Sequence, residues 1–270
     1  MFFSAIKKEP IPERIFSICN VVVDREPINK KEIEKILVPE KLKVETSYFG
    51  SVFETAEELK LIGYDDNDDV IFIGDKNNIE SLHALRRYCN SFVFYDRSTD
   101  FYKIISCFLS ADDEWLSYGR MTTSPEIIRI INNETGIKSL SLEKDVLLGI
   151  RFWINYLGFG YYQENQGVFL PNMYTALRDF MALGSIEEKE YTVEEFIGHL
   201  HEGVSVALKG SNDTLKLNLA MSNALRLMHD NKEIELKRIS DSKKVWHLFP
   251  NEEHEFTSEI THIAIKKAVE

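Results

Sequence analysis

Residues 56–74 read AEELKLIGYDDNDDVIFIG, and their pattern determines the fold class that we predict. Apolar residues at helical spacing come first, and two extended runs then flank a polar turn. The same pattern returns as IRFWINYLGFGYYQENQGVFLP, residues 150–171, and as NALRLMHDNKEIELKRISDSKKVWHLFP, residues 223–250. The sequence therefore predicts three copies of a helix followed by a hairpin.

A helix followed by a small hairpin is typical of the last part of a winged-helix module. The sequence thus predicts an α+β fold, mainly α, in which tandem winged-helix modules are joined by a helical segment. The predicted units are an acidic first module, a helical connector, a winged-helix-like second module and a third module with a basic wing, at residues 1–76, 77–140, 141–185 and 186–270.

Composition limits the class of protein. The chain has 270 residues, 44% of them hydrophobic, and a formal net charge of −12, which opposes wholesale wrapping of nucleic acid. No apolar stretch is long enough to span a membrane, and the first residues resemble no signal peptide, so we expect a cytoplasmic protein. Cys19, Cys89 and Cys107 lack metal-ligand spacing and are expected to be buried apolar residues.

The first module is expected to be acidic on its outer surface. Pro12 suits a first helical turn, Asn29 suits a helix cap, and a third helix is expected over residues 45–61, closed by Gly63. Its exposed side is expected to carry Glu45, Glu54, Glu57 and Glu58, and the turn of its hairpin carries Asp65, Asp66, Asp68 and Asp69. These carboxylates repel phosphate, so the turn is either a solvated surface or a contact for a basic partner protein. The spacing does not match a calcium-binding loop.

The connector and the second module carry fewer signals. Residues 79–136 are expected to be mostly helical, and residues 158–170 are expected to form a short hairpin. Arg151 and Arg178 are interpreted as surface or salt-bridging residues rather than phosphate anchors. Gly158 and Gly160 lack the strand and the third glycine of a dinucleotide site.

The third module holds the candidate DNA-binding surface. It opens with a capping box at Thr192 and Glu195, and residues 209–250 carry a net charge of +3. The candidate residues lie on the helix over residues 217–229 and around the turn of the expected hairpin over residues 234–249. They are Lys216, Asn218, Asn223, Arg226, Lys237, Arg238, Lys243 and Lys244. The alternative is that these charges only keep a strand edge soluble.

No motif for catalysis is found. His199 and His201 are two residues apart, so they point to different sides of a helix and do not form a zinc pair. The sequence lacks a nucleophile elbow, a phosphate-binding loop and a nuclease-like acidic pair. We therefore expect no enzymatic activity, no metal and no cofactor.

Three segments together carry a family resemblance. They are PERIFSICNVVVDREPINKKEIEKIL at residues 12–37, the acidic turn, and FWINYLGFGYYQENQGVFLPNMYTALRDF at residues 152–180. They resemble the accessory G protein of the 7-deazaguanine DNA-modification (Dpd) defence islands of bacteria, over most of the chain. The resemblance implies a non-enzymatic adaptor subunit that works beside modification and restriction enzymes against phage or foreign DNA. It implies no particular functional residues.

Two other functions stay open at this point. One is a kleisin-binding tandem winged-helix subunit of a chromosome-organising ATPase, which would need an apolar docking groove. The other is a transcription regulator, which would present symmetric basic helices, and the single basic module weighs against it. The expected partners are the other subunits of a defence or DNA-processing complex and double-stranded DNA, with no membrane; the sequence does not indicate an oligomeric state.

Overall fold

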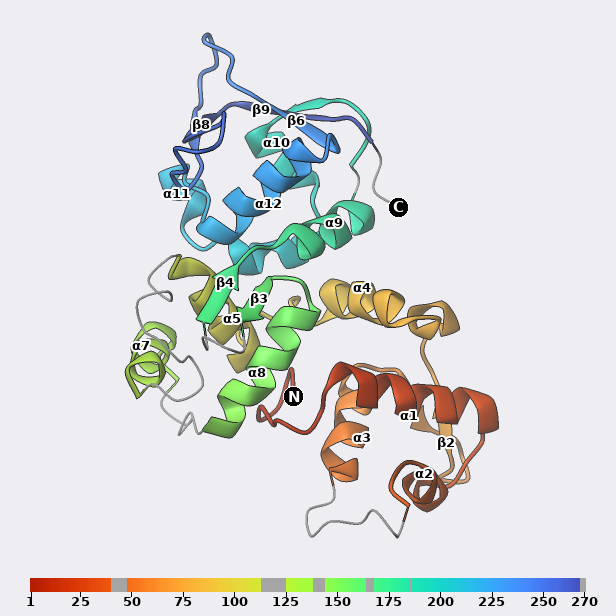
Figure 1. Cartoon of the computed structure of the whole chain (residues 1–270). Helices are drawn as coiled ribbons and strands as arrows, with labels where there is room; N and C mark the ends of the chain where they lie inside the picture. The colour runs from red at the N-terminus through yellow and green to blue at the C-terminus, as the bar shows by residue number, and fades with distance from the viewer. Residues whose placement is uncertain (40–47, 113–124, 138–143, 164–167, 185, 268–270) are drawn as a thin grey trace.

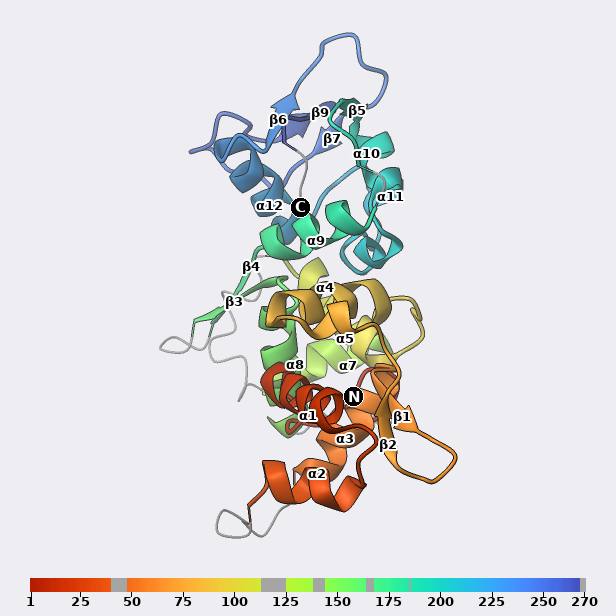
Figure 2. The same cartoon turned by 90° about the vertical axis from the view of Figure 1, so that its right-hand side faces the viewer.

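Helices dominate the structure, and small antiparallel sheets accompany them. The computed structural model describes residues 1–39, 48–112, 125–137, 144–163, 168–184 and 186–267 (Figure 1). The N-terminal helices lie at one end of an elongated body and the C-terminal strands lie at the other (Figures 1 and 2). The predicted class, α+β and mainly α, is confirmed, whereas the tandem winged-helix arrangement stays a prediction.

The N-terminal part has the predicted order of three helices and a hairpin. Its elements are α1 (Pro12–Arg25), α2 (Lys30–Leu37), α3 (Phe49–Glu58), β1 (Ile62–Tyr64) and β2 (Val70–Phe72). Pro12 occupies the first turn of α1, and the Asn29 side chain accepts a hydrogen bond from the Lys31 amide at the start of α2, as expected. Ile28 also pairs with Val70, which adds a third extended segment to the hairpin.

The third helix is shorter than expected. It ends at Glu58, because Lys60 has a φ of 53° and the Leu61 amide donates back to the Ala56 carbonyl. A residue in the left-handed region ends a helix in this way, and here it is Lys60 rather than Gly63. The predicted start at Glu45 lies outside the described residues.

The middle of the chain is helical, as predicted for residues 79–136, within the parts described. Its elements are the 3₁₀ helix η2 (Lys76–Ile79), α4 (Leu82–Phe92), α5 (Asp100–Ser110), α7 (Pro125–Thr135), α8 (Lys144–Tyr156), β3 (Gly160–Gln163), β4 (Val168–Pro171) and α9 (Tyr174–Leu183). The second hairpin forms in the expected place, with Tyr161 opposite Leu170. The residues predicted at its turn, 164–167, lie outside the described residues.

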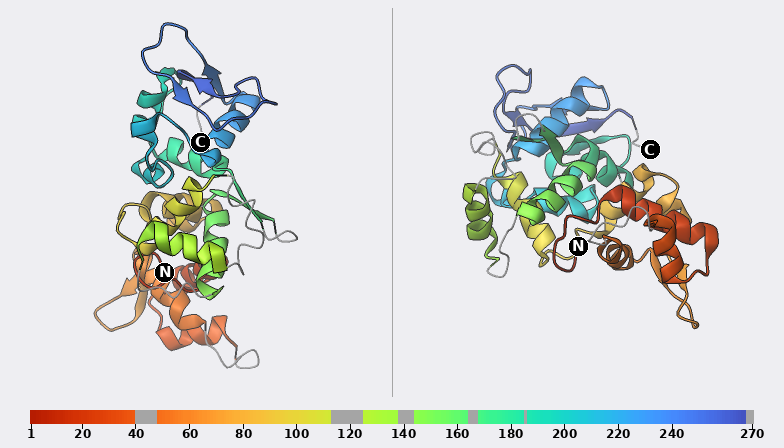
Figure 3. Two further views of the ribbon diagram at one scale, coloured as in Figure 1. Left: turned by 90° about the vertical axis from the view of Figure 1, so that its left-hand side faces the viewer. Right: turned by 60° about the horizontal axis from the view of Figure 1, so that its bottom comes forward.

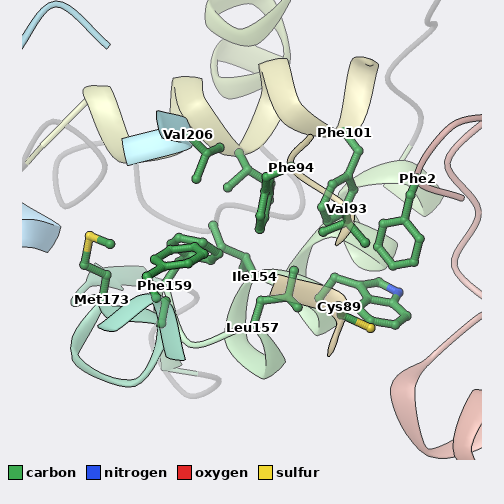
Figure 4. Packing of buried hydrophobic residues seen from close by; sticks show 14 of the residues in the cluster. Phe2, Cys89, Val93, Phe94, Phe101, Ile154, Leu157, Phe159, Met173 and Val206 are labelled. Atoms are coloured by element: carbon green, nitrogen blue, oxygen red, sulfur yellow. The ribbon is translucent and has the colours of Figure 1, made fainter. Parts of the chain in front are cut away.

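Aromatic side chains from distant segments build the middle of the core. The Phe2 ring stands edge-on to Phe101 and to Trp153, at centroid distances of 4.8 and 4.6 Å, and Phe94 stands edge-on to Phe159 at 5.3 Å. Figure 4 shows the four phenylalanine rings with Cys89, Val93, Ile154, Leu157, Met173 and Val206 in one cluster. The three cysteines are free and buried, as the sequence predicted. The buried apolar residues form a continuous cluster along the chain, and the unit boundaries stay predictions.

The C-terminal part differs from the expected helix and hairpin. Its elements are β5 (Glu190–Thr192), α10 (Val193–His199), the 3₁₀ helix η3 (Glu202–Ala207), α11 (Ser211–Thr214), α12 (Leu219–Asp230), β6 (Ile234–Lys237), β7 (Trp246–His247), β8 (Glu259–Ile260) and β9 (His262–Ile265). The predicted helix is present as α12, and the predicted capping box of Thr192 and Glu195 opens α10.

The third predicted hairpin is wrong. β6 pairs with β9 in a sheet of order β5-β9-β6, and β7 pairs with β8 in a separate two-stranded sheet. The reason is burial, because β9 contains the buried residues Ile263, Ala264 and Ile265 and pairs with β6, the strand that packs on α12. Residues 238–245 therefore form a long loop between two sheets rather than the turn of one hairpin (Figure 2).

Candidate functional site

The acidic turn between β1 and β2 is held by its own first residue. The Asp65 Oδ1 accepts hydrogen bonds from the amides of Asn67 and Asp69 at 2.9 and 3.0 Å, and Asp68 has a φ of 62°. The side chains of Asp66 and Asp68 are exposed, whereas Asp65 and Asp69 are half-buried. The hairpin projects from the N-terminal helices (Figure 3, orange). Asp66 and Asp68 are therefore the carboxylates that this turn presents to solvent.

The acidic side of α3 is partly occupied from within the chain. The Glu58 Oε2 accepts a hydrogen bond from the Phe2 amide at 3.0 Å, and Glu54 pairs with the Lys7 ammonium at 2.9 Å. Burial alone would raise the pKa of Glu58, but hydrogen bonds from the Met1 ammonium, Ser4 and the Phe2 amide outweigh it and lower that pKa. Glu58 thus positions the N-terminal segment rather than facing solvent as predicted.

Three of the predicted basic residues form ion pairs with glutamates that lie before or after the loop over residues 238–245, which we call the basic loop. Lys237 lies 2.6 Å from Glu190, Arg238 lies 2.9 Å from Glu259, and Lys244 lies 2.6 Å from Glu194. The hydrogen bond to Glu190 raises the pKa of Lys237, and the same bond lowers the pKa of Glu190, so both stay charged at neutral pH. These three glutamates lie outside residues 209–250 and offset the net charge of +3 that the sequence assigns to that segment.

Two further basic candidates, Lys216 and Lys243, are placed differently. Lys216 and Lys243 are exposed, and neither forms a salt bridge within the described residues. Lys216 pairs through its backbone with His247, and Lys243 lies in the loop over residues 238–245. These two ammonium groups can approach a phosphate without first breaking an ion pair.

The polar candidates on α12 have structural contacts. Asn218 caps the helix, since its side chain accepts from the Met221 amide at 2.8 Å and donates to the Ala207 carbonyl at 2.8 Å. The Asn223 side chain donates to the Pro171 carbonyl at 3.0 Å. Arg226 is only 4% exposed and donates to the carbonyls of Phe249, Phe256 and Thr257. The sequence predicted these residues as DNA contacts because their hydrogen bonds to backbone carbonyls depend on the folded chain and leave no local pattern.

The two charged surfaces do not form one site. The acidic turn lies at the N-terminal end of the body, and the loop over residues 238–245 lies at the opposite end (Figures 1 and 2). A ligand that touches both would have to span the molecule, so the two surfaces are separate.

A hollow that the sequence did not indicate lies between α5, α7, α10 and η3. Its volume is about 660 Å³, and its walls carry Lys103, Lys209, Glu134 and Glu202. The Tyr102 hydroxyl donates to the Ser205 hydroxyl across 3.2 Å at its wall, and Lys209 lies 3.6 Å from Glu134. No local motif marks this hollow, because its lining comes from segments about 100 residues apart.

The described parts of the chain offer neither a metal site nor a membrane-spanning helix. The described residues contain no group of three or more His, Cys, Asp or Glu side chains placed to hold a metal ion. Within the same parts of the chain, no helix is both long and apolar enough to cross a bilayer. His199 lies at the end of α10 and His201 precedes η3, where its Nδ1 accepts from the Gly203 amide.

Comparison with known proteins identifies a family for most of the chain. Neither a curated protein nor a solved structure matches this chain. The model of the DpdG-like family matches residues 5–242, which is most of the sequence and includes the three segments that carry the resemblance. The chain therefore belongs to the DpdG-like family.

Proposed function

We propose that this protein is a non-catalytic accessory subunit of a bacterial Dpd DNA-modification or anti-phage defence system. Membership of the DpdG-like family is the observation that carries the proposal. The absence of a catalytic motif from the sequence agrees with an adaptor role. In this role the protein binds partner proteins at its N-terminal end and double-stranded DNA at its C-terminal end.

The N-terminal part supports the winged-helix component of this proposal. The chain runs α1, the paired residue Ile28, α2, α3 and the β1–β2 hairpin, which is the order that a winged-helix module requires. A DNA-reading module of this kind needs donors on its third helix and wing. Here the turn carries Asp66 and Asp68, so a basic surface of a partner protein fits this end better than phosphate does.

Reversing the charge of the acidic turn is expected to release the partner. The variant Asp66→Lys with Asp68→Asn removes both exposed carboxylates and leaves Asp65 to close the turn. Asn is chosen at position 68 because it tolerates a positive φ. Co-expression with the other Dpd components and affinity capture should recover a component with the unaltered chain and at least about tenfold less of it with the variant.

A matched control reverses two exposed carboxylates at the other end of the molecule, Glu252→Lys with Glu253→Lys. This control is expected to retain the captured component. Equal recovery with all three proteins would show that the acidic turn is not the contact, and recovery of none of the components by the unaltered chain would contradict the adaptor role.

DNA binding through the C-terminal end is expected to depend on Lys216 and Lys243. We expect the variant Lys216→Glu with Lys243→Glu to weaken binding of a short duplex and to lower the salt slope by about 0.9 for each lost phosphate contact. Fluorescence anisotropy at two salt concentrations measures both quantities. The fourfold variant of Lys237, Arg238, Lys243 and Lys244 to Glu should abolish binding, but it also breaks three ion pairs, so its unfolding must be measured beside it.

The acidic-turn variant serves as the control for this titration, because it should bind DNA as well as or better than the unaltered chain. Equal losses of affinity in both variants would contradict the assignment of DNA to the C-terminal end. No salt-dependent binding by the unaltered chain would leave an adaptor that contacts proteins alone.

A further inference from the structure

A cleft between α4 and α9 gathers arginines in a chain that is strongly acidic. The two helices lie side by side, α9 above α4 (Figure 1). The cleft has a volume of about 360 Å³, and its lining residues are His83, Arg86, Arg87, Tyr174, Thr175, Arg178 and Asp179. Three arginines and one carboxylate line it, so its lining is positive while the whole chain carries a net charge of −12.

The single carboxylate of the lining is already occupied. Asp179 is 2% exposed, its two oxygens accept from Arg86 Nε and Nη2 at 2.8 and 3.1 Å, and its Oδ2 also accepts from the Asn90 side chain at 2.8 Å. This two-point contact fixes the plane of the Arg86 guanidinium. Asp179 therefore positions an arginine and does not face the opening of the cleft.

The other two arginines reach the solvent side of the cleft. The side chains of Arg87 and Arg178 are 45% and 42% exposed. The Arg178 Nη1 lies 3.8 Å from Glu233 Oε1 and donates to the Tyr174 hydroxyl at 3.4 Å. A guanidinium carries five N–H donors, so these two contacts of Nη1 leave most of the donors of Arg178 for a ligand.

Two side chains at the start of α9 complete the wall. Tyr174 and Thr175 lie beside Arg178, and both are half-buried. The Tyr174 hydroxyl donates its proton to Glu233 Oε1 and accepts from Arg178 Nη1, so the neutral donor of this wall is the Thr175 hydroxyl. Arginines with a rigid planar fork and a nearby hydroxyl group are a donor set that recognises phosphate oxygens.

We propose that this cleft binds a phosphate group, with Arg87 and Arg178 as the contacting side chains and Arg86 as a fixed third cation. The group belongs either to a phosphodiester of DNA or to a free nucleotide, since both present the same oxygens. The site lies apart from Lys216 and Lys243, so it does not depend on the DNA contact proposed for the C-terminal end.

Titration calorimetry on the full chain tests this site with three probes: inorganic phosphate, adenosine monophosphate and a short DNA duplex. The unaltered chain is expected to bind at least one of them. The variant Arg87→Gln with Arg178→Gln should weaken that binding by at least about tenfold. Arg129→Gln, an exposed arginine on α7, is the matched control and should bind as the unaltered chain does.

The probes distinguish the source of the phosphate. Tight binding of adenosine monophosphate that DNA does not displace identifies a nucleotide site, and binding of DNA alone identifies a phosphodiester contact. The single variant Arg178→Lys keeps the charge but loses the fork, and an intermediate affinity is expected. Failure of all three probes to bind, or unchanged affinity in the Gln variant, would overturn the proposal.

The Lys216→Glu and Lys243→Glu variant separates this site from the proposed function. Phosphate binding that survives in this variant supports an independent cleft, even where DNA binding at the C-terminal end is lost. Phosphate binding that disappears in this variant and persists in the Arg87 and Arg178 variant would assign the phosphate to the C-terminal end and overturn the cleft.

Discussion

Replacement of Arg226 by alanine is expected to lower the free energy of unfolding by about 3 kcal/mol, because it removes a buried charged donor from three backbone carbonyl acceptors. The guanidinium donates to Phe249 O and Thr257 O at 2.8 Å each and to Phe256 O at 3.1 Å. It thereby ties residues 249–257 to α12, and burial lowers its pKa without bringing it near neutral pH. Urea denaturation followed by circular dichroism measures the loss.

The variant Arg226→Lys is the control for this prediction. A single ammonium keeps the charge but cannot reach three carbonyls from one plane, so an intermediate loss is expected. The sequence predicted Arg226 as a DNA contact, and the two roles give opposite results. A variant with normal stability and no DNA affinity would restore the predicted role, whereas a destabilised variant supports the structural one.

Local signals in the sequence correctly predicted the elements whose contacts lie nearby in the chain. Asn29 and the pair of Thr192 and Glu195 cap helices through hydrogen bonds that span only two or three residues. The first two hairpins also form where predicted, because each turn joins strands only a few residues apart. Such contacts need no knowledge of the rest of the fold.

The third hairpin could not be predicted in the same way. The alternation in β6 shows that it is a strand but does not show which strand it joins, and its partner β9 begins 25 residues after its end. Residues 251–267 lie beyond the repeated pattern, so the pattern itself indicated the wrong pairing. The choice depends on which apolar face covers α12, and that is a property of the folded core.

The candidate sites show the same limit. The positive charges around the basic loop are offset by Glu190, Glu194 and Glu259. These partners lie up to about 50 residues away in the sequence, so a charge count over one segment does not include them. Arg86 and Arg178 lie about 90 residues apart and meet only because α4 packs on α9. The sequence shows which side chains are charged, but it does not show which of them form ion pairs.

Replacement of Asp179 by alanine is expected to cost about 4 kcal/mol of unfolding free energy, since removal of one partner leaves a largely buried charge without compensation. The carboxylate accepts from Arg86 and from Asn90, which is fully buried and also donates to the Leu157 carbonyl. These bonds join α4, α9 and the end of α8. The loss should therefore appear as a single cooperative shift in the urea midpoint rather than as unfolding of one helix.

A double-mutant cycle with Arg86→Ala separates the ion pair from packing. The double variant no longer holds an uncompensated buried charge, so its loss should be smaller than the sum of the two single losses by about 1–3 kcal/mol. The exposed variant Arg129→Ala, combined with Asp179→Ala in the same way, should show additive losses. If the losses of the Asp179 and Arg86 variants were additive, Asp179 would stabilise the fold through Asn90 alone. The ion pair with Asp179 would then not be what fixes the plane of the Arg86 guanidinium in the α4–α9 cleft.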